Sequence, residues 1–278
     1  PRYSAAFRDQ MPHSAMAKRV AEILGPVGLD VIALGPGDGR NEARLVQHIL
    51  EQGQRPNLRF YLLDASQPLL SYAFKHAVDT FSEKSGVHTL LAHGNFHDLG
   101  QYPQVSYMPA KGRRRRIYTM LGYTLSNLDS EPRFFEHSLA HSQAGDMLLL
   151  DFQQRPSSVG ASDDEIRRLD PVFRSSFPQA HAEWLGAPLR AHCFDYVGHE
   201  FAFQLVNHCL IPGSYALDAI ATVRTRSQTE RRFSMFRFKR YDEALLAESL
   251  ARFGWEKLVS LPIGESDRAP VAMLLVKR

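Results

Sequence analysis

Short apolar segments alternate with helical patterns along the first half of the chain, and this alternation limits the fold more than any other feature. The apolar segments have the length of buried strands and lie at 29–34, 58–63, 89–92, 117–121 and 147–152. Apolar residues at helical spacing precede or separate them, at 14–24, 41–52, 67–82 and 132–142. Buried strands that alternate with amphipathic helices are typical of βαβ units around a parallel sheet. The sequence therefore predicts an α/β fold with a doubly wound, mostly parallel, Rossmann-like core.

The pattern changes after residue 155 and returns near the end of the chain. Residues 155–190 are rich in Pro, Ser, Arg and Asp, with a helical stretch near 163–173. Extended segments at 199–209, 214–226 and 231–239 predict antiparallel strands. A helix at 241–253 and strands at 255–261 and 271–276 predict a C-terminal antiparallel hairpin. We therefore expect a core formed by 1–155 and 241–278, with an inserted, β-rich, substrate-covering region at 156–240.

The composition is that of an ordinary globular protein. The chain has 278 residues, of which 44% are hydrophobic and 23% charged, with a formal net charge of +3. This mild basic excess does not require a nucleic-acid or membrane partner. No apolar run approaches the roughly 20 residues that cross a bilayer, and no signal-peptide segment follows Pro1. With two cysteines, Cys193 and Cys209, we expect a cytoplasmic protein. The sequence starts at Pro1, which leaves open that the chain is part of a longer one.

A glycine-rich loop, Gly35-Pro36-Gly37-Asp38-Gly39, directly follows the first apolar segment. Between a strand and a helix, such glycines permit a tight turn and a close approach of the backbone to a ligand. The spacing is G-x-G-x-G, whereas the dinucleotide motif that seats a pyrophosphate is G-x-G-x-x-G. This difference favours S-adenosyl-L-methionine (SAM), with S-adenosyl-L-homocysteine (SAH) as its product, over NAD. Gly35, Gly37 and Gly39 are the expected cofactor-binding residues, and a loop that only turns the chain is the alternative.

Polar residues also follow the second and third strands. Asp64 ends the second segment, where an acidic side chain of Rossmann-like folds accepts hydrogen bonds from ribose hydroxyls. The alternative for Asp64 is the N-cap of the helix that starts near residue 67. Ser66 is assigned to the same cofactor site. We expect Asn95 to bond the adenine edge with Phe96 packed beside the ring, and a turn residue is the alternative for Asn95.

The loop after the fourth strand brings several polar groups together. It contains Gly122, Tyr123, Thr124 and Asn127. Ligands bind beyond the carboxyl ends of parallel strands, so this loop is expected to line the site of chemistry. We assign Gly122 to the cofactor, Tyr123 and Asn127 to catalysis, and Thr124 and Asn127 to the substrate. The alternatives are a supporting aromatic ring for Tyr123 and a turn or N-cap residue for Asn127.

Two further patterns carry less specific signals. The run Arg113-Arg114-Arg115-Arg116 is interpreted as a solvated loop before the fourth strand, with nucleic-acid contact as an alternative that nothing else supports. Several histidines and cysteines lie in the later part of the chain, and their spacing matches no common zinc site. We therefore expect packed side chains and no metal at these positions: His192, Cys193, His199, His208 and Cys209.

Taken together, these motifs resemble the histidine-specific methyltransferase family, which includes the histidine Nα-methyltransferases of ergothioneine synthesis and fungal dimethylallyltryptophan N-methyltransferases. The similarity is clearest at Met120–Leu128, where the family reads Phe-Leu-Gly-Ser/Gly-Thr-Ile-Gly-Asn-Phe. It extends through roughly 14–155, with weaker likeness at 231–255. The resemblance implies a class I SAM-dependent methyltransferase core in which Gly35, Gly37, Gly39 and Asp64 hold SAM. It also implies that Asn127 matches the family asparagine that contacts the substrate's α-amino group.

The chain departs from this family at several positions. Ala33 stands where the family has an acidic residue, Asn95 replaces its aspartate, and Met11-Pro12-His13-Ser14 replaces its Tyr-Tyr-Pro region. The family's Glu-x-Ser pair, which reads the histidine ring, aligns with Met235-Phe236-Arg237. Without that pair a buried imidazole would keep an unpaired nitrogen, which is costly. Histidine itself is therefore not the expected substrate.

The sequence thus predicts a SAM-dependent methyltransferase that N-methylates a small-molecule amine, such as an amino acid or a derivative. Asn127 would orient the amine, and Tyr196 and Tyr215 of the inserted region are assigned to substrate contacts. Three alternatives remain open at this point: a peptide or other macromolecular acceptor, a non-catalytic SAM-binding module of a longer protein, and a nicotinamide oxidoreductase. No pattern indicates an oligomeric state.

Overall fold

The chain divides into two compact units. The computed structural model describes residues 10–24, 27–53, 57–81, 86–102, 114–173, 179–193, 195–207, 209–265 and 269–278. The first unit comprises Pro1–Gln153 with Ala247–Arg278, and the second comprises Gln154–Leu246. The predicted insertion, 156–240, lies within the second unit.

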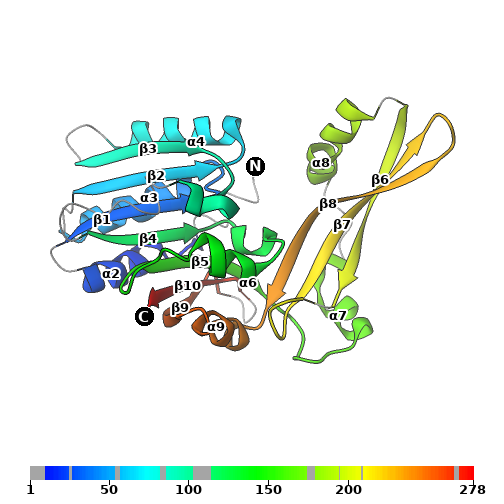
Figure 1. Ribbon diagram of the computed structural model, residues 1–278. Coiled ribbons are helices and arrows are strands. Elements are labelled where there is room, and N and C mark those ends of the chain that lie inside the picture. The colour runs from blue at the N-terminus through cyan, green and yellow to red at the C-terminus, as the bar shows by residue number, and fades with distance from the viewer. Residues whose placement is uncertain are drawn as a thin grey trace. The chain divides into compact units, whose positions relative to one another are not determined.

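The first unit contains a mostly parallel sheet (Figure 1). Its strands pair in the order β3-β2-β1-β4-β5-β10-β9. The strands β1 to β5 are parallel to their neighbours in this order, whereas β10 is antiparallel to both β5 and β9. The bounds are β1 (Gly28–Leu34), β2 (Leu58–Asp64), β3 (Val87–His93), β4 (Arg114–Met120), β5 (Met147–Gln154), β9 (Trp255–Pro262) and β10 (Val271–Lys277). The predicted parallel strands and C-terminal hairpin are confirmed, and the strand order reverses between β1 and β4, where ligands bind in such sheets.

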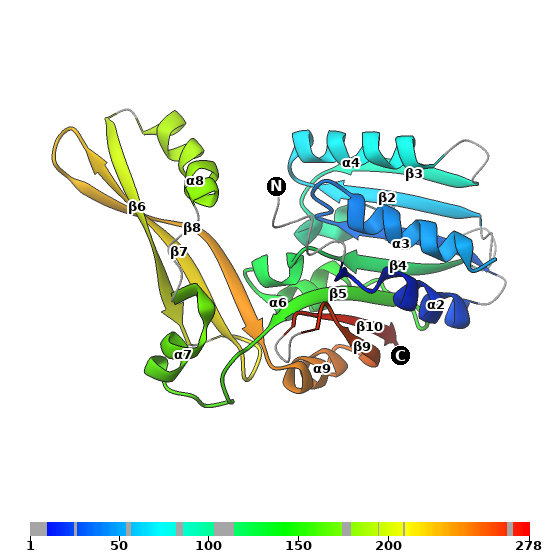
Figure 2. The same cartoon turned by 180° about the vertical axis from the view of Figure 1, so that it is seen from behind.

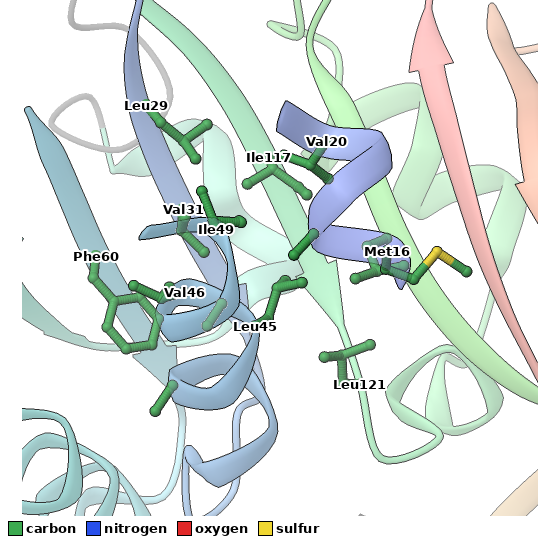
Figure 3. Packing of buried hydrophobic residues seen from close by; sticks show 14 of the residues in the cluster. Met16, Val20, Leu29, Val31, Leu45, Val46, Ile49, Phe60, Ile117 and Leu121 are labelled. Carbon is green, nitrogen blue, oxygen red and sulfur yellow. The ribbon is translucent and has the colours of Figure 1, made fainter. Parts of the chain in front are cut away.

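Helices α2 (His13–Leu24), α3 (Arg40–Glu51) and α4 (Gln67–Thr80) belong to the same unit. In Figure 2, α2 and α3 lie in front of the sheet. Val20 of α2 and Val46 of α3 share an apolar cluster with Val31 of β1, and all three are fully buried (Figure 3). Each such side chain contributes roughly 1.5–3 kcal/mol when it is removed from water. The apolar runs of β1, β2, β4 and β5 are therefore explained by strands buried on both faces. The strand β3 differs, because it lies at the edge of the sheet and leaves Leu90 and Leu91 41% and 50% exposed.

The segment between β4 and β5 differs from the prediction. A helix was expected at 132–142, but the structure has a short α6 (Glu131–Arg133) followed by a π-helical turn, η4 (Phe134–Ser138). Both Phe134 and Phe135 are buried, at 1% and 2% exposure. The wider turn lets two adjacent aromatic rings enter the core, which explains why the helical spacing predicted too long a helix.

The second unit is built on an antiparallel sheet, as predicted. Its strands are β6 (Tyr196–Val206), β7 (Tyr215–Thr225) and β8 (Glu230–Tyr241), with β7 paired to both of the others. It also contains α7 (Asp163–Leu169), the 3-10 turn η5 (Pro171–Phe173) and α8 (Gln179–His192). Helix α8 was not predicted because Pro188 lies inside it, and proline usually ends a helix. The chain then forms α9 (Glu243–Ala251) before β9.

The arginine run is not a solvated loop in its described part, 114–116, because it forms the start of β4. The Nε atom of Arg114 donates to Asp30 Oδ1 at 2.8 Å, and the Nε atom of Arg59 donates to the same oxygen at 2.7 Å. Arg116 is 8% exposed and its backbone N–H donates to Asp146 at 3.2 Å. Arg113 lies outside the described residues. The interpretation of Arg114 and Arg116 as solvated was therefore wrong, since both are tied to buried aspartates.

None of the helices that the structure describes has both the length and the apolar character needed to cross a membrane.

Candidate active site

The loop after β1 has a conformation that glycine adopts most easily. Gly35, Gly37 and Gly39 have φ values of 63°, 58° and 72°. A Cβ atom at Gly39 would lie 2.9 Å from that of Ala73, so this glycine allows the loop to pack against α4. At Gly37, by contrast, no described atom lies within 4 Å of an added Cβ. Gly37 therefore leaves open space beside the main chain, as required for a backbone that approaches a ligand.

Asp64 is the last residue of β2 and is 9% exposed. Its Oδ1 atom accepts the backbone N–H of Ser66 at 2.7 Å. Its Oδ2 atom has no hydrogen-bond partner among the residues that the structure describes. Ser66 itself precedes α4 and makes no side-chain cap bond. The Asp64 carboxylate thus does not cap α4, and one of its oxygens is open to a ligand hydroxyl.

Asn95 and Phe96 follow β3 as predicted. Asn95 acts as a turn residue, which was the alternative to an adenine contact. The Asn95 side chain accepts the backbone N–H of His97 at 3.1 Å, which caps the 3-10 turn η2 (Phe96–Gln101). The Phe96 ring stacks on His97 with centroids 4.9 Å apart and meets the Phe134 ring edge-on at 5.9 Å. This packing holds Phe96 in place, and the predicted adenine contact of Asn95 stays a prediction.

Contacts between loops bring these motifs together. The backbone N–H of Gly35 donates to the carbonyl of Leu63 at 2.9 Å, which joins the loop after β1 to the end of β2. A Cβ atom at Gly35 would lie 3.2 Å from both the Phe96 ring and the Thr124 methyl group. The loops that follow β1, β3 and β4 therefore meet beside the carboxyl end of β2, and Gly35 is the residue they share.

The loop after β4 is held by an aspartate of β5. Gly122 and Tyr123 are both left-handed, with φ values of 74° and 66°. The Gly122 N–H donates to Asp151 Oδ2 at 2.8 Å, and the Tyr123 N–H donates to Asp151 Oδ1 at 2.6 Å. The Thr124 hydroxyl is buried and donates to the Leu121 carbonyl at 2.9 Å. The proton of Thr124 is thus engaged within the loop, while its predicted substrate contact stays a prediction.

Asn127 ends the 3-10 turn η3 (Thr124–Asn127) and is exposed. Within the described part of the chain, its side-chain amide has no hydrogen-bond partner. The next helix is instead capped by Ser130, whose hydroxyl accepts the N–H of Arg133 at 3.3 Å. The N-cap alternative for Asn127 is therefore not observed, and its amide is available to a ligand.

Two buried acids beside this loop were not predicted. Burial raises the pKa of Asp151 to about 7, although its hydrogen bonds from the backbone lower it. Burial also raises the pKa of Glu42, on α3, to about 8, with a further contribution from the charge of Asp151. Asp151 could have been noticed, because it follows the apolar run Met147–Leu150 at the carboxyl-terminal part of a strand. Glu42 carries no such signal, since it reads as an ordinary acidic residue in the first turn of a helix.

The two tyrosines assigned to substrate lie in the second unit. Tyr196 begins β6, and its hydroxyl lies 2.6 Å from Nδ1 of His199. Tyr215 is fully buried, and its hydroxyl donates to Asp170 at 2.8 Å. Burial also raises the pKa of Tyr215, with the charge of Asp170 as a second cause. The assignment of Tyr215 to substrate is therefore corrected: the residue belongs to the core of the second unit, with Ile166 and Leu217.

Groups of three or more His, Cys, Asp or Glu side chains with a metal-binding arrangement were not found among the described residues. In the described part of the chain Cys193 and Cys209 form no disulfide, and the Cys209 thiol donates to the Val206 carbonyl at 3.8 Å. His208, which was part of the histidine and cysteine pattern, lies outside the described residues.

The sheet order with its antiparallel C-terminal hairpin, the glycine loop after β1 and the acidic end of β2 define the class of protein. The chain is a class I SAM-dependent methyltransferase. The residues present fit this cofactor, since Gly37 leaves space beside the backbone and Asp64 retains an open carboxylate oxygen. The model of the family described as histidine-specific, SAM-dependent methyltransferases matches residues 13–199, and the chain belongs to that family.

The fold is also similar to several solved structures. A SAM-dependent methyltransferase from Clostridium acetobutylicum ATCC 824 has 14% identity and a TM-score of 0.49, with 98% of this chain and 91% of that chain covered. The sugar N-methyltransferase KedS8 from Streptoalloteichus sp ATCC 53650 has 13% identity, a TM-score of 0.46 and coverages of 97% and 88%. The 1,6-didemethyltoxoflavin-N1-methyltransferase from Burkholderia thailandensis has 11% identity, a TM-score of 0.47 and coverages of 99% and 89%. The search of curated proteins returned no match.

Proposed function

We propose that this methyltransferase transfers a methyl group to the amine nitrogen of a small molecule, an amino acid or a derivative other than histidine. The observation that carries the proposal is the exposed amide of Asn127, which has no hydrogen-bond partner within the described residues and follows β4 in the loop that contacts Gly35. An amide oxygen at this position accepts a hydrogen bond from an amine and thereby orients the nitrogen lone pair.

The cofactor residues have distinct roles in this proposal. Gly35, Gly37 and Gly39 allow the backbone to approach SAM, and Asp64 Oδ2 accepts a hydrogen bond from its ribose. Phe96 packs beside the adenine, with Asn95 at its edge, and Gly122 and Ser66 complete the site. When it is bound, SAM supplies a methyl group activated by a positively charged sulfur. The protein's contribution is then to align a neutral amine, through Asn127 and Tyr123, and to exclude water.

The exclusion of histidine rests on the second unit. The residues that align with the family's imidazole-reading pair are Met235 and Arg237. Met235 packs against an apolar cluster that contains Leu189 and Val223. Arg237 forms two hydrogen bonds with Asp218, at 2.6 and 2.7 Å. Neither side chain is a carboxylate or hydroxyl that could pair with both imidazole nitrogens. We propose that the inserted region, 156–240, including Tyr196, instead provides contacts that select a different amine.

The cofactor assignment is tested by calorimetry with SAM, SAH and NAD on one protein preparation. We expect micromolar binding of SAM and SAH and no binding of NAD. Binding of NAD in place of SAM would contradict the assignment.

The acceptor is tested with a defined pool of amino acids, their decarboxylated amines and amino sugars, with methyl transfer from labelled SAM detected by mass spectrometry. We expect Asn127→Ala to lower kcat about 100-fold on any acceptor found, because the amine is no longer oriented. The matched control is Gln47→Ala, which removes an exposed amide from α3. If Asn127→Ala and the control have equal rates, Asn127 does not orient the acceptor.

A further inference from the structure

Tyr123 holds a backbone conformation that bulky residues avoid. Its φ is 66°, and Gly122 before it has a φ of 74°, so two consecutive residues are left-handed. Among the described non-glycine residues, Gln228 is the other with a positive φ. For an L-residue this conformation costs roughly 1–2 kcal/mol. Such strain persists only where surrounding groups determine the backbone, so a group outside the loop is expected to hold it.

That group is Asp151 of β5. Its Oδ2 and Oδ1 atoms accept the N–H groups of Gly122 and Tyr123, at 2.8 and 2.6 Å. The side chain is fully buried, with 0% exposure. Each N–H group thus has its own carboxylate oxygen, and charge-assisted bonds of this kind are about twice as strong as neutral ones. The pair of bonds fixes the direction of both peptide groups where the chain leaves β4.

We propose that Asp151 is a positioning residue for methyl transfer, whose carboxylate holds the two N–H groups and so places Tyr123 and Asn127 where they act. Asp151 itself contacts neither cofactor nor acceptor in this proposal. The turn η3 begins at Thr124, directly after Tyr123, so its direction follows from the backbone at Tyr123. The inference rests on the roles proposed for Asn127 and Tyr123. A displacement of about 1 Å in such a group can reduce the rate about 100-fold.

A second buried acid, Glu42, interacts with Asp151. Glu42 is 1% exposed, and its Oε2 atom has no hydrogen-bond partner in the described structure. After burial, the charges of Asp151 and Asp38 raise the pKa of Glu42 further, to about 8. Asp151 has the lower pKa of the two acids, about 7, because the N–H groups of Gly122 and Tyr123 favour its ionised form, and it therefore loses its proton before Glu42 as the pH rises.

The chain offers a matched control next to the same strand. Asp146 directly precedes β5 and is 5% exposed. Its Oδ1 atom accepts the N–H of Arg116 at 3.2 Å, and its Oδ2 atom accepts the N–H of Gln143 at 2.9 Å. It is therefore a second buried carboxylate that bridges two backbone N–H groups, but it lies at the opposite end of the strand from the loops around Gly35.

The test compares Asp151→Asn and Asp146→Asn with the wild-type chain. In either variant the new amide nitrogen faces an N–H donor, so one of the two bonds is lost. Three quantities are measured: SAH affinity by calorimetry, hydrogen exchange of the peptide containing Gly122 and Tyr123, and kcat with the best amine of the pool described above. For Asp151→Asn we expect faster exchange in this peptide and a kcat about 100-fold lower. SAH affinity should fall less than about tenfold, a change of less than about 1.4 kcal/mol, because Gly122 is the one proposed cofactor residue that Asp151 is seen to hold.

Asp146→Asn should leave both the exchange of this peptide and kcat close to wild type, even if it lowers the melting temperature. Equal losses of kcat in the two variants would overturn the proposal, because they would reflect general destabilisation. An unchanged kcat in Asp151→Asn would also overturn it. If the wild-type chain methylates no amine of the pool, the proposed function fails separately. Hydrogen exchange of Asp151→Asn with SAH bound then tests the role of Asp151. Lost protection confined to the loop after β4 supports this role, and protection equal to that of wild type overturns it.

Discussion

The two ends of the parallel sheet are both polar, but their charges are arranged in opposite ways. At the amino ends of β1 and β4, Asp30 accepts hydrogen bonds from both Arg59 and Arg114, and Asp146 accepts the N–H of Arg116. At the carboxyl ends, the buried acids Glu42 and Asp151 have raised pKa values and no arginine or lysine among the causes of those shifts.

The charged residues at the amino ends of the strands thus hold strands together, whereas those at the carboxyl ends shape a site. A carboxylate that is bonded by two arginines has its hydrogen-bonding capacity filled and has none left for a ligand. Acids that are desolvated without a cation are costly, and such arrangements cluster at functional sites. The amino end is therefore expected to control stability, and the carboxyl end is expected to control binding and turnover.

The largest expected effect is at the amino end. Asp30→Ala leaves two arginines, 24% and 12% exposed at their side chains, without their shared carboxylate. Breaking a buried ion pair by removing one partner costs about 3–5 kcal/mol. We expect a melting temperature lower by roughly 10 °C in calorimetric scans, with SAM affinity unchanged once the protein is folded. If Asp30→Ala melts at the wild-type temperature but binds SAM poorly, the amino end controls binding rather than stability and the comparison fails.

Glu42→Gln should produce the next largest effect, which grows from about pH 5 and is complete above about pH 8. The pKa of Glu42 is raised from 4.5 to about 8, with Asp151 and Asp38 as its charged neighbours. Between these two pH values the folded protein holds a proton that the unfolded chain has lost, so the free energy of unfolding falls as pH rises. The glutamine removes this loss. We expect its melting temperature to exceed that of wild type by several degrees at pH 9 and to match it near pH 5. A pH-independent difference would show that Glu42 is not a buried, protonated acid.

Asp64→Ala tests the carboxyl end by binding. The loss of a charge-assisted hydrogen bond to a ribose hydroxyl should weaken SAM and SAH about 10-fold or more, which is about 1.4 kcal/mol. The melting temperature without ligand should change little, because the Asp64 carboxylate bonds one nearby N–H, that of Ser66, among the described residues. Calorimetric titration checks the first expectation and a thermal scan the second. SAM binding that is indifferent to this change would remove Asp64 from the site.

Gly122→Ala should give the smallest effect, and it has a counterpart at the amino end. No described atom lies within 4 Å of an added Cβ at Gly122, so the cost is the left-handed backbone alone, roughly 1–2 kcal/mol. At Gly28 an added Cβ would lie 2.5 Å from a guanidinium nitrogen of Arg114. Gly28→Ala therefore acts through the ion pair with Asp30. Denaturant unfolding of both variants, with kcat, should show lower turnover for Gly122→Ala only. The comparison fails if Gly28→Ala also lowers turnover.

The features predicted correctly from sequence are those encoded by neighbouring residues. The run Leu29–Leu34 and the glycines that follow it predicted both β1 and its loop, because strand, turn and helix are adjacent in the chain. The errors about charged residues concern partners that are distant in sequence. Arg114 pairs with Asp30, which lies 84 residues earlier in the chain. Because this partner is not nearby in sequence, the run of arginines was interpreted as solvated. The role of Asp151 depends on N–H groups 28 and 29 residues earlier, which no local pattern reveals.

The C-terminal hairpin has a consequence for how the protein is made. The strand β10 lies between β5 and β9, yet it is separated from β5 in the chain by the whole second unit. A ribosome that adds roughly 5–20 residues per second needs several seconds to synthesise that stretch. Throughout this delay the edge of β5 that β10 later occupies is unpaired, and its apolar side chains are an aggregation hazard. The nascent chain is therefore expected to need a chaperone, or a rapidly folding second unit, before its first unit can close.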